Sequence, residues 1–221
     1  MNQNPNHRRR VLITAGPTHE PIDAVRFLGN RSSGRMGIAL ARAASAAGHS
    51  VVLLLGPTSI PVDDSSVRVV RFRTASDLRE LLAIESPNAD VLVMAAAVAD
   101  YRPKPLAALS GGKFRRSNEP VVLELEPTPD LLAEVSSRRL PGQRLVGFAL
   151  EPRAAMLESA LAKLERKKVD LVVANPLETM DSLEIEGVVV GPGGKAILPP
   201  RVSMPKAEFA SWLVEVLMGR S

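Results

Sequence analysis

The sequence predicts an α/β fold: a doubly wound, Rossmann-like, mostly parallel sheet with helices on both faces. Short apolar runs rich in branched residues alternate with amphipathic runs of helical length, and glycine or proline follows several of the apolar runs. Such alternation is typical of βαβ units, in which the crossover is right-handed and the strands are parallel. The chain has 221 residues and is 45% apolar, which is enough to bury a full core.

The first half of the chain supplies most of the predicted strands. The run VLITA stops at Gly16-Pro17, and VVLLL follows directly after a helical pattern that ends at Gly48, a favoured helix-stop residue. The segment 74–86 opens with a Thr or Ser cap, as helices do. The predicted elements are, in order, strand 11–15, helix 36–48, strand 51–55, strand 67–72, helix 74–86 and strand 90–100, which ends in an acid.

The second half continues the alternation after an interruption. Residues 101–122 are rich in proline, glycine and basic residues, and we predict a loop that covers a site as a lid; an ordinary surface excursion is the alternative. The elements that follow are helix 128–140, strand 143–151, helix 152–169 opened by Pro152, strand 170–175, a C-terminal hairpin at 187–199 turning at 191–194, and helix 205–219. We predict a single domain over 11–221 and a disordered basic N-terminus over 1–10.

Composition excludes several classes of protein. The chain has no cysteine, which excludes disulfides, thiolate metal sites and a cysteine nucleophile. No apolar run is long enough to span a membrane or to act as a secretory signal. We therefore expect a soluble, cytoplasmic protein.

The basic charge indicates an anionic partner. The net charge is +4, and the basic residues lie in short clusters such as HRRR, KFRR and KLERKK. One Trp, one Tyr and five Phe offer few stacking platforms for single-stranded nucleic acid, so we expect phosphorylated small molecules and no nucleic acid. The alternative for each cluster alone is a solvated surface.

The segment 28–37 (LGNRSSGRMG) lies between an apolar strand and a predicted helix. A helix N-terminus offers unpaired N–H groups and a partial positive charge, which favour a bound anion. The short residues leave room for phosphate oxygens. The amide of Asn30 could stabilise a developing oxyanion, and a turn role is its alternative. We predict a phosphate cradle of Ser32, Ser33, Gly34 and Gly37.

Other nucleotide sites fit the sequence poorly. A dehydrogenase that binds NAD(P) is the competing hypothesis. However, the loop after the first strand is long and lacks the G-x-G-x-x-G motif. In addition, no acidic residue follows the second strand to bind the ribose hydroxyls. A P-loop is also absent. His7, His19 and His49 show no metal-ligand spacing, so we predict no protein-bound metal, and Mg²⁺ carried on phosphates is expected instead.

Several motifs together resemble a known family. ITAGPTHEPIDAVRFLGNRSSGRMG, AAAVADYRP, GGKFRR, TPDLL, VGFALE and KLERKKVDLVVAN occur in the order seen in phosphopantothenoylcysteine synthetases, the second half of a bacterial coenzyme A biosynthesis protein often fused to a flavin decarboxylase. The resemblance extends over 11–218. It implies a ligase that joins 4′-phosphopantothenate to L-cysteine. CTP would form an acyl-cytidylate with release of pyrophosphate, and the cysteine amine would then displace CMP.

The resemblance also implies roles for individual residues. Asn30 matches the asparagine assigned to the acyl-cytidylate step, and Lys113 of the lid would close over the phosphates; Lys104 is the alternative lid lysine because the lid is longer than usual. Gly29 and Pro152 depart from the common family pattern. The implied nucleotide contacts are Met94, Ala95, Ala96, Asp100, Lys113, Pro129, Asp130, Leu131, Leu132, Phe148, Lys163 and Lys167.

Partners follow from the same resemblance. We expect a homodimer, with the basic lid and the C-terminal hairpin as candidate contacts, and a phosphopantothenoylcysteine decarboxylase as a separate partner if that activity is not on the same polypeptide. A non-catalytic nucleotide-binding module on the same fold remains the alternative to an enzyme.

Overall fold

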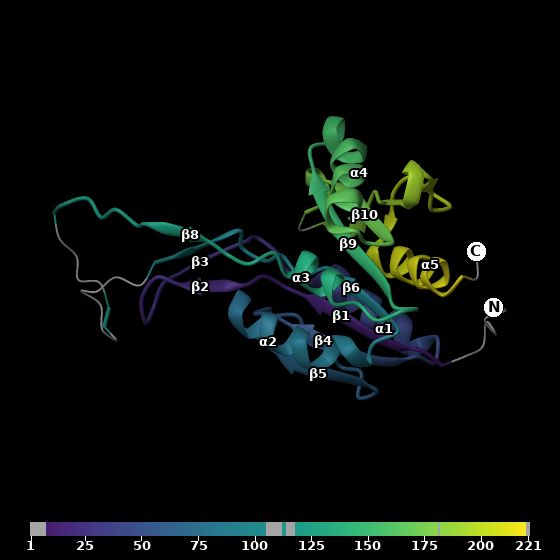
Figure 1. Cartoon of the computed structure of the whole chain (residues 1–221), viewed down its shortest axis with the longest axis horizontal. Coiled ribbons are helices and arrows are strands. Elements are labelled where there is room, and N and C mark those ends of the chain that lie inside the picture. Colours follow the sequence, from purple (N-terminus) through teal and green to yellow (C-terminus); the bar gives the residue numbers. More distant parts are fainter. Residues whose placement is uncertain (1–7, 105–111, 114–117, 181, 220–221) are drawn as a thin grey trace.

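The computed structural model describes residues 8–104, 112–113, 118–180 and 182–219, and the account below concerns these residues (Figure 1). An eight-stranded sheet has the order β13-β12-β10-β9-β6-β1-β4-β5. The strands from β10 to β5 pair in parallel, and β12 and β13 are antiparallel. This topology confirms the predicted doubly wound sheet. The strands are β1 Arg10–Ala15, β4 Ser50–Leu55, β5 Val67–Arg71, β6 Val91–Met94, β9 Arg144–Glu151, β10 Leu171–Pro176, β12 Val188–Val190 and β13 Ala196–Ile197.

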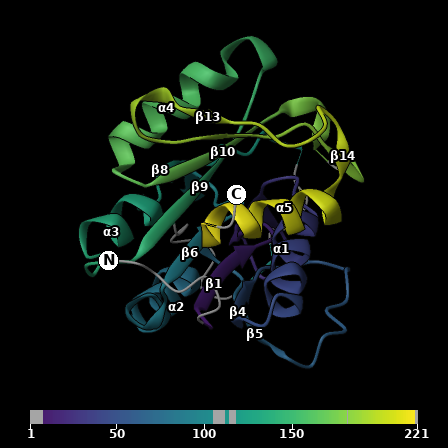
Figure 2. The ribbon, with the colours of Figure 1, turned by 90° about the vertical axis from the view of Figure 1, so that its right-hand side faces the viewer.

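Helices cover both faces of this sheet (Figure 2). Helices α1 and α5 pack on one face, and α2, α3 and α4 pack on the other. Side chains of β1 divide between the two cores because neighbouring residues of a strand point to opposite faces: Val11 and Ile13 join the α1–α5 core, whereas Leu12 joins the other. The helices are α1 Arg35–Ala46, α2 Ala75–Glu85, α3 Leu131–Ser137, α4 Met156–Lys167 and α5 Lys206–Met218.

Local sequence signals explain where several helices begin and end. Thr74 and Asp77 form a capping box at the start of α2, and the Asp130 side chain accepts from the Ala133 N–H at the start of α3. Gly48 follows α1 with a φ of +85°, which suits glycine. Helix α4 begins at Met156 and not at Pro152, because residues 153–155 form a 3₁₀ turn first.

The prediction of a strand over 90–100 is wrong beyond Met94, where β6 ends. Residues 95–99 are small and apolar, so they mimic a strand in sequence. Their backbone leaves the regular ladder and bonds instead to the segment that follows β1, including a bridge between Pro17 and Ala97. Residues 95–99 therefore form an irregular loop at the carboxyl end of the sheet.

A long arm projects from the body of the molecule, and the sequence did not predict its strands (Figure 1). Strand β2 (His19–Pro21) pairs with β3 (Phe27–Gly29), and β7 (Tyr101–Pro103) pairs with β8 (Leu125–Pro127). The predicted loop at 101–122 thus begins as a strand. Much of the predicted lid, at 105–111 and 114–117, lies outside the described residues.

The C-terminal hairpin is confirmed. Strands β12 and β13 pair around a turn at 192–194, closed by a hydrogen bond of 2.8 Å from the Gly191 N–H to the Lys195 carbonyl. A smaller ladder joins β11 (Glu184–Ile185) to β14 (Met204–Pro205). No helix within the described residues is both long and apolar enough to cross a membrane.

Candidate active site

Two adjoining cavities open at the carboxyl ends of the parallel strands, where α/β sheets bind ligands. The small cavity, of about 350 Å³, lies between the end of β6, the start of α3, Phe148 of β9 and one face of α4. The large cavity, of about 610 Å³, lies over the segment 29–37 and the start of α1, and extends to α5. Five residues line both cavities and so form a wall that the cavities share: Ala96, Val98, Asp100, Phe148 and Lys163.

The loop 95–100 in this wall is held by buried threonine hydroxyls. Thr14 Oγ1 accepts from the Ala96 N–H at 3.1 Å, and Thr18 Oγ1 accepts from the Ala99 N–H at 3.0 Å. Both threonines are fully buried. Thr128 donates from its hydroxyl to the carbonyl of Ala99. Each backbone N–H and carbonyl group of an irregular segment needs a hydrogen-bond partner. In this loop the threonine hydroxyls supply hydrogen bonds that a neighbouring strand would otherwise supply.

Asn30 lies on the large cavity and contacts the same loop. Its Nδ2 donates to the Val98 carbonyl at 3.1 Å. An amide carries two N–H groups, so this bond orients the side chain and leaves a second donor. The predicted oxyanion donor is therefore fixed at the edge of the shared wall.

The predicted cradle residues Ser32, Ser33, Gly34 and Gly37 all line the large cavity. Gly34 precedes α1 with a φ of +74°, and no described side chain caps the start of this helix. The Ser33 carbonyl is fixed by Thr58, whose hydroxyl donates to it at 2.7 Å. Gly37 has a different reason to be small: a Cβ there would lie 2.4 Å from the Ala15 Cβ, so it lets α1 pack on β1.

Three cations of α4 line the small cavity: Lys163, Arg166 and Lys167. Lys163 donates from Nζ to the Phe148 carbonyl, and Lys167 forms an ion pair with Asp130. Burial lowers the pKa of Lys163, the charge of Glu151 raises it and the charge of Arg166 lowers it. Burial also lowers the pKa of Lys167. The cavity is thus electropositive, and its two lysines hold their protons less tightly than ordinary lysines.

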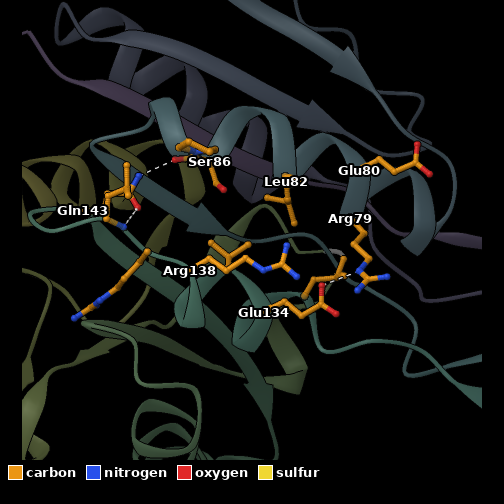
Figure 3. A pocket seen from close by; sticks show the side chains of 13 residues that line it. Arg79, Glu80, Leu82, Ser86, Glu134, Arg138 and Gln143 are labelled. Atoms are coloured by element: carbon orange, nitrogen blue, oxygen red, sulfur yellow. Dashed lines mark hydrogen bonds and ion pairs between the residues drawn. The ribbon is translucent and has the colours of Figure 1, made fainter.

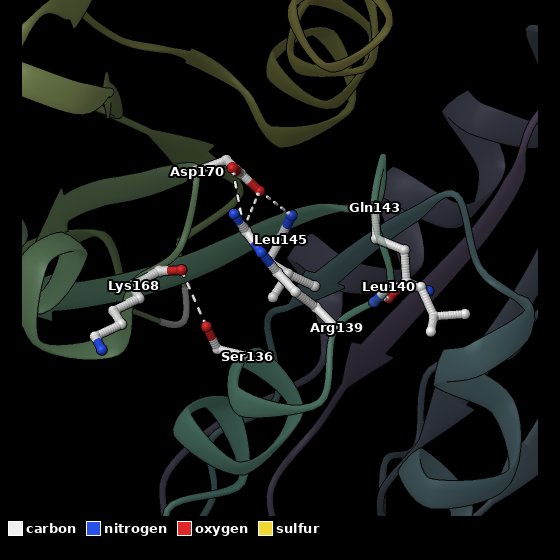
Figure 4. A network of polar contacts seen from close by, with 7 residues as sticks. All are labelled: Ser136, Arg139, Leu140, Gln143, Leu145, Lys168 and Asp170. Atoms are coloured by element: carbon white, nitrogen blue, oxygen red, sulfur yellow. Dashed lines mark hydrogen bonds and ion pairs between the residues drawn. The ribbon is translucent and has the colours of Figure 1, made fainter.

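Helix α3 brings Asp130, Leu131 and Leu132 to the small cavity and is anchored at its other end. There the Ser136 hydroxyl donates to the Lys168 carbonyl at 3.0 Å (Figure 4). Asp170 accepts from the Leu145 N–H at 2.7 Å and from the Arg139 guanidinium. These bonds tie α3 and the turn after it to β9 and β10, and so fix the position of this wall of the cavity.

The structure brings most of the predicted site residues together. Met94, Ala96, Asp100, Phe148, Lys163, Lys167 and the run Pro129–Leu132 line the small cavity, and Ala95 lines the large one. Lys113 is exposed, with its neighbours 105–111 and 114–117 outside the described residues, so its role stays a prediction. Lys104, the alternative lid lysine, pairs with Glu124 across the arm, and its role also stays a prediction.

Other lining residues were missed by sequence reasoning. Arg35 opens α1 on the large cavity, and its Nε is buried with no hydrogen-bond partner among the described residues. Arg166 lies three residues after Lys163, so helical spacing alone could have identified it. Asn175 and the buried Lys206 reach the large cavity from β10 and α5, and no local signal predicts that approach.

A groove between α2 and α3 forms a third cavity, of about 340 Å³, which shares Leu131 with the small cavity (Figure 3). Leu82, Leu131 and Val135 form its apolar floor. Arg79 and Glu134 bridge it with an ion pair of 2.8 Å. Across the described part of the chain, no group of three or more His, Asp or Glu side chains is placed to hold a metal ion.

Comparison with known proteins identifies the family of this chain. A family model described as the DNA/pantothenate metabolism flavoprotein C-terminal domain matches residues 6–219. The chain belongs to this family. Among relatives, coenzyme A biosynthesis bifunctional protein CoaBC of Mycobacterium bovis is 44% identical over 187 residues, which are 80% of this chain and 44% of the relative. A protein named cysteine/cysteine sulfinic acid decarboxylase, from an unknown prokaryotic organism, is 42% identical over 178 residues, with 80% and 48% covered.

Solved structures of the DNA/pantothenate metabolism flavoprotein family share the fold. The C-terminal domain of a coenzyme A biosynthesis bifunctional protein CoaBC superposes with a TM-score of 0.80 at 33% identity and covers 98% of this chain and 97% of that domain. A family structure from Streptococcus pneumoniae has a TM-score of 0.81 at 22% identity, with 96% and 100% covered. The present chain spans about half the length of the relatives named above, 44% and 48%.

Proposed function

We propose that this chain is a phosphopantothenate–cysteine ligase, which joins 4′-phosphopantothenate to L-cysteine at the expense of CTP. Its support is membership of the family described above and the 33% identity to a CoaBC C-terminal domain over nearly the whole chain. The observation that carries the proposal is the pair of cavities with one shared wall at Ala96, Asp100 and Lys163. Two substrates in adjoining cavities meet at such a wall.

The nucleotide is assigned to the small cavity because that cavity holds three cations on one helix face. The phosphopantothenate is assigned to the large cavity, with its phosphate at the cradle of Ser32, Ser33 and Gly34 before α1. Mg²⁺ belongs to the nucleotide substrate, and Asp100, which lines both cavities, is the carboxylate suited to contact the water around such an ion.

The reaction then has two steps. The carboxylate of phosphopantothenate attacks the α-phosphorus of CTP, a new O–P bond forms and pyrophosphate leaves. The cysteine amine next attacks the carbonyl carbon of the mixed anhydride, loses a proton and expels CMP. Holding both reactants in adjoining cavities converts a bimolecular reaction into an effectively unimolecular one, which lowers the entropic cost of reaching the transition state.

Asn30 serves the second step in this account. The tetrahedral species carries negative charge on the former carbonyl oxygen, and a neutral amide donor stabilises this charge without protonating the attacking amine. The bond to the Val98 carbonyl keeps Asn30 in place beforehand. Lys113 is proposed to add charge over the phosphates as part of a lid.

The test is to incubate the protein with 4′-phosphopantothenate, Mg²⁺ and either CTP or ATP, with and without cysteine, and to measure pyrophosphate and the cysteine amide. We expect pyrophosphate with CTP and the amide only when cysteine is present. CTP binding without turnover would instead identify a non-catalytic nucleotide-binding module. Saturable NAD(P)H binding would identify a dehydrogenase.

We also propose that the protein forms a homodimer and works with a separate phosphopantothenoylcysteine decarboxylase where that activity is not on the same polypeptide. Support for the dimer comes from the arm, on which Val25, Phe27, Tyr101 and Leu125 are 60%, 45%, 53% and 43% exposed. Apolar side chains gathered on a projecting arm favour a protein partner over water. Light scattering of the purified chain measures the oligomeric state directly.

A further inference from the structure

The α4 face of the small cavity contains one cation, Arg166, that is not among the residues predicted from the sequence. Arg166 lies between Lys163 and Lys167 on this face, at three residues from the first and one from the second. Side chains at i, i+3 and i+4 of a helix are neighbours, so all three charges face the same cavity. A neutral base and ribose do not require three cations, whereas a triphosphate does.

The three cations differ in their present partners. Lys163 donates to the Phe148 carbonyl, and Lys167 is paired with Asp130. Within the described residues, the Arg166 guanidinium makes neither a hydrogen bond nor an ion pair. A ligand anion that binds Arg166 therefore breaks no bond inside the protein, while binding to either lysine competes with an existing contact.

The charge of Arg166 already acts inside the cavity. It lowers the pKa of Lys163, after the larger effects of burial, which lowers this pKa, and of the Glu151 charge, which raises it. Two like charges held close together are stabilised when an anion lies between them. A guanidinium also keeps its charge at every physiological pH and can bind two phosphate oxygens at once.

We propose that Arg166 is a nucleotide-binding residue that contacts the phosphate groups, and that it sets the affinity for the triphosphate more than Lys167 does. This rests on the proposed function in one respect, namely that the small cavity holds the nucleotide. Sequence reasoning selected the two lysines on this helix and passed over the arginine between them. The physical difference is that Lys167 must break its ion pair with Asp130 to bind a phosphate, whereas Arg166 has no such contact to break within the described residues.

The experiment compares the wild-type protein with Arg166→Gln and Arg166→Lys by calorimetric titration with CTP, CMP, cytidine and inorganic tripolyphosphate. Arg138→Gln is the matched control, because Arg138 is also exposed and its guanidinium has no partner among the described residues, yet it lines the α2–α3 groove instead. Thermal unfolding of each variant verifies the fold. Lys167→Gln supplies the second comparison.

We expect Arg166→Gln to raise the Kd for CTP about tenfold or more, the Kd for CMP less, and the Kd for cytidine not at all. Arg166→Lys should recover part of the loss, Lys167→Gln should lose less than Arg166→Gln, and Arg138→Gln should match the wild type. If Arg166→Gln leaves the Kd for CTP unchanged, this inference is overturned and the proposed function is not. The same holds if the variant loses as much affinity for cytidine as for CTP. A wild-type protein that binds no nucleotide overturns both this inference and the proposed nucleotide site.

Discussion

The small cavity and the α2–α3 groove are almost equal in size, at about 350 and 340 Å³, yet they differ in chemistry. In the small cavity, charge faces the open space: Asp100 lies in the loop that follows β6 at the carboxyl end of the sheet, and Lys163 reaches the cavity from α4. In the groove, Arg79 is neutralised by Glu134, and the floor is apolar. Each cavity also contains an arginine that is unpaired among the described residues, Arg138 in the groove and Arg166 in the small cavity, so position at the carboxyl ends of the parallel strands, and not volume, distinguishes the proposed catalytic region.

Asn30→Ala should have the largest effect, because it removes the proposed oxyanion donor. We expect kcat for amide formation to fall about 10²–10³-fold. Pyrophosphate release should continue, so the acyl-cytidylate should accumulate and be detectable by mass spectrometry. Asn88→Ala, at an exposed amide beside the groove region, should retain full activity. Equal rates for Asn30→Ala and wild type would remove Asn30 from the mechanism.

Thr18→Val should have the next largest effect, because it tests the hydroxyls that hold the loop 95–100. Removing the acceptor leaves the Ala99 N–H without its partner in a buried setting, and we expect kcat/KM to fall about tenfold. Thr18→Ser keeps the hydroxyl and should recover most of this loss. Hydrogen exchange at the Ala99 amide should rise in the valine variant, a readout that does not depend on turnover.

The pH dependence of nucleotide binding tests the small cavity through Lys163. Its pKa is lowered by burial, so Lys163 loses its charge as pH rises at a point below the ordinary value of 10.5. CTP affinity should therefore begin to fall in that alkaline range. Lys163→Arg stays charged there, so its fall in affinity should be smaller. Superimposable pH profiles for the two proteins would show that Lys163 does not carry the charge that matters.

The groove should give the smallest effect. Ala83→Trp places a large side chain on its exposed α2 wall, and we expect kcat and KM to stay at wild-type values. A loss of activity comparable with that of Thr18→Val would contradict the contrast between the two cavities. Thermal unfolding distinguishes such a loss from damage to the fold.

The sheet and its helices could be predicted because their signals are local. Apolar runs such as VLITA, the cap at Thr74 and the stop at Gly48 each lie within a few residues of the element that they define. The arm could not be predicted, because β7 and β8 are three residues each and pair Tyr101 with Pro127 across a long insertion. The small residues after Met94 misled the prediction because their hydrogen-bond partners, such as Thr18, are distant in sequence.

The candidate site divides in the same way. Residues within recognisable motifs, such as Asn30, Asp100 and Lys163, were selected from the sequence, and the structure brings them to one wall. Arg35 and Lys206 depend on which elements approach the large cavity, and the sequence alone does not determine that approach. Motifs thus identify residues of the candidate site better than they predict its outline.

The most direct test of the central claim follows oxygen from substrate to product. Phosphopantothenate labelled with ¹⁸O in its carboxylate is incubated with CTP, Mg²⁺, cysteine and the protein, and the CMP is analysed by mass spectrometry. We expect one ¹⁸O in the phosphate of CMP, because the carboxylate oxygen becomes the bridge of the acyl-cytidylate and leaves with the nucleotide. Unlabelled CMP, or label in inorganic phosphate instead, would contradict it.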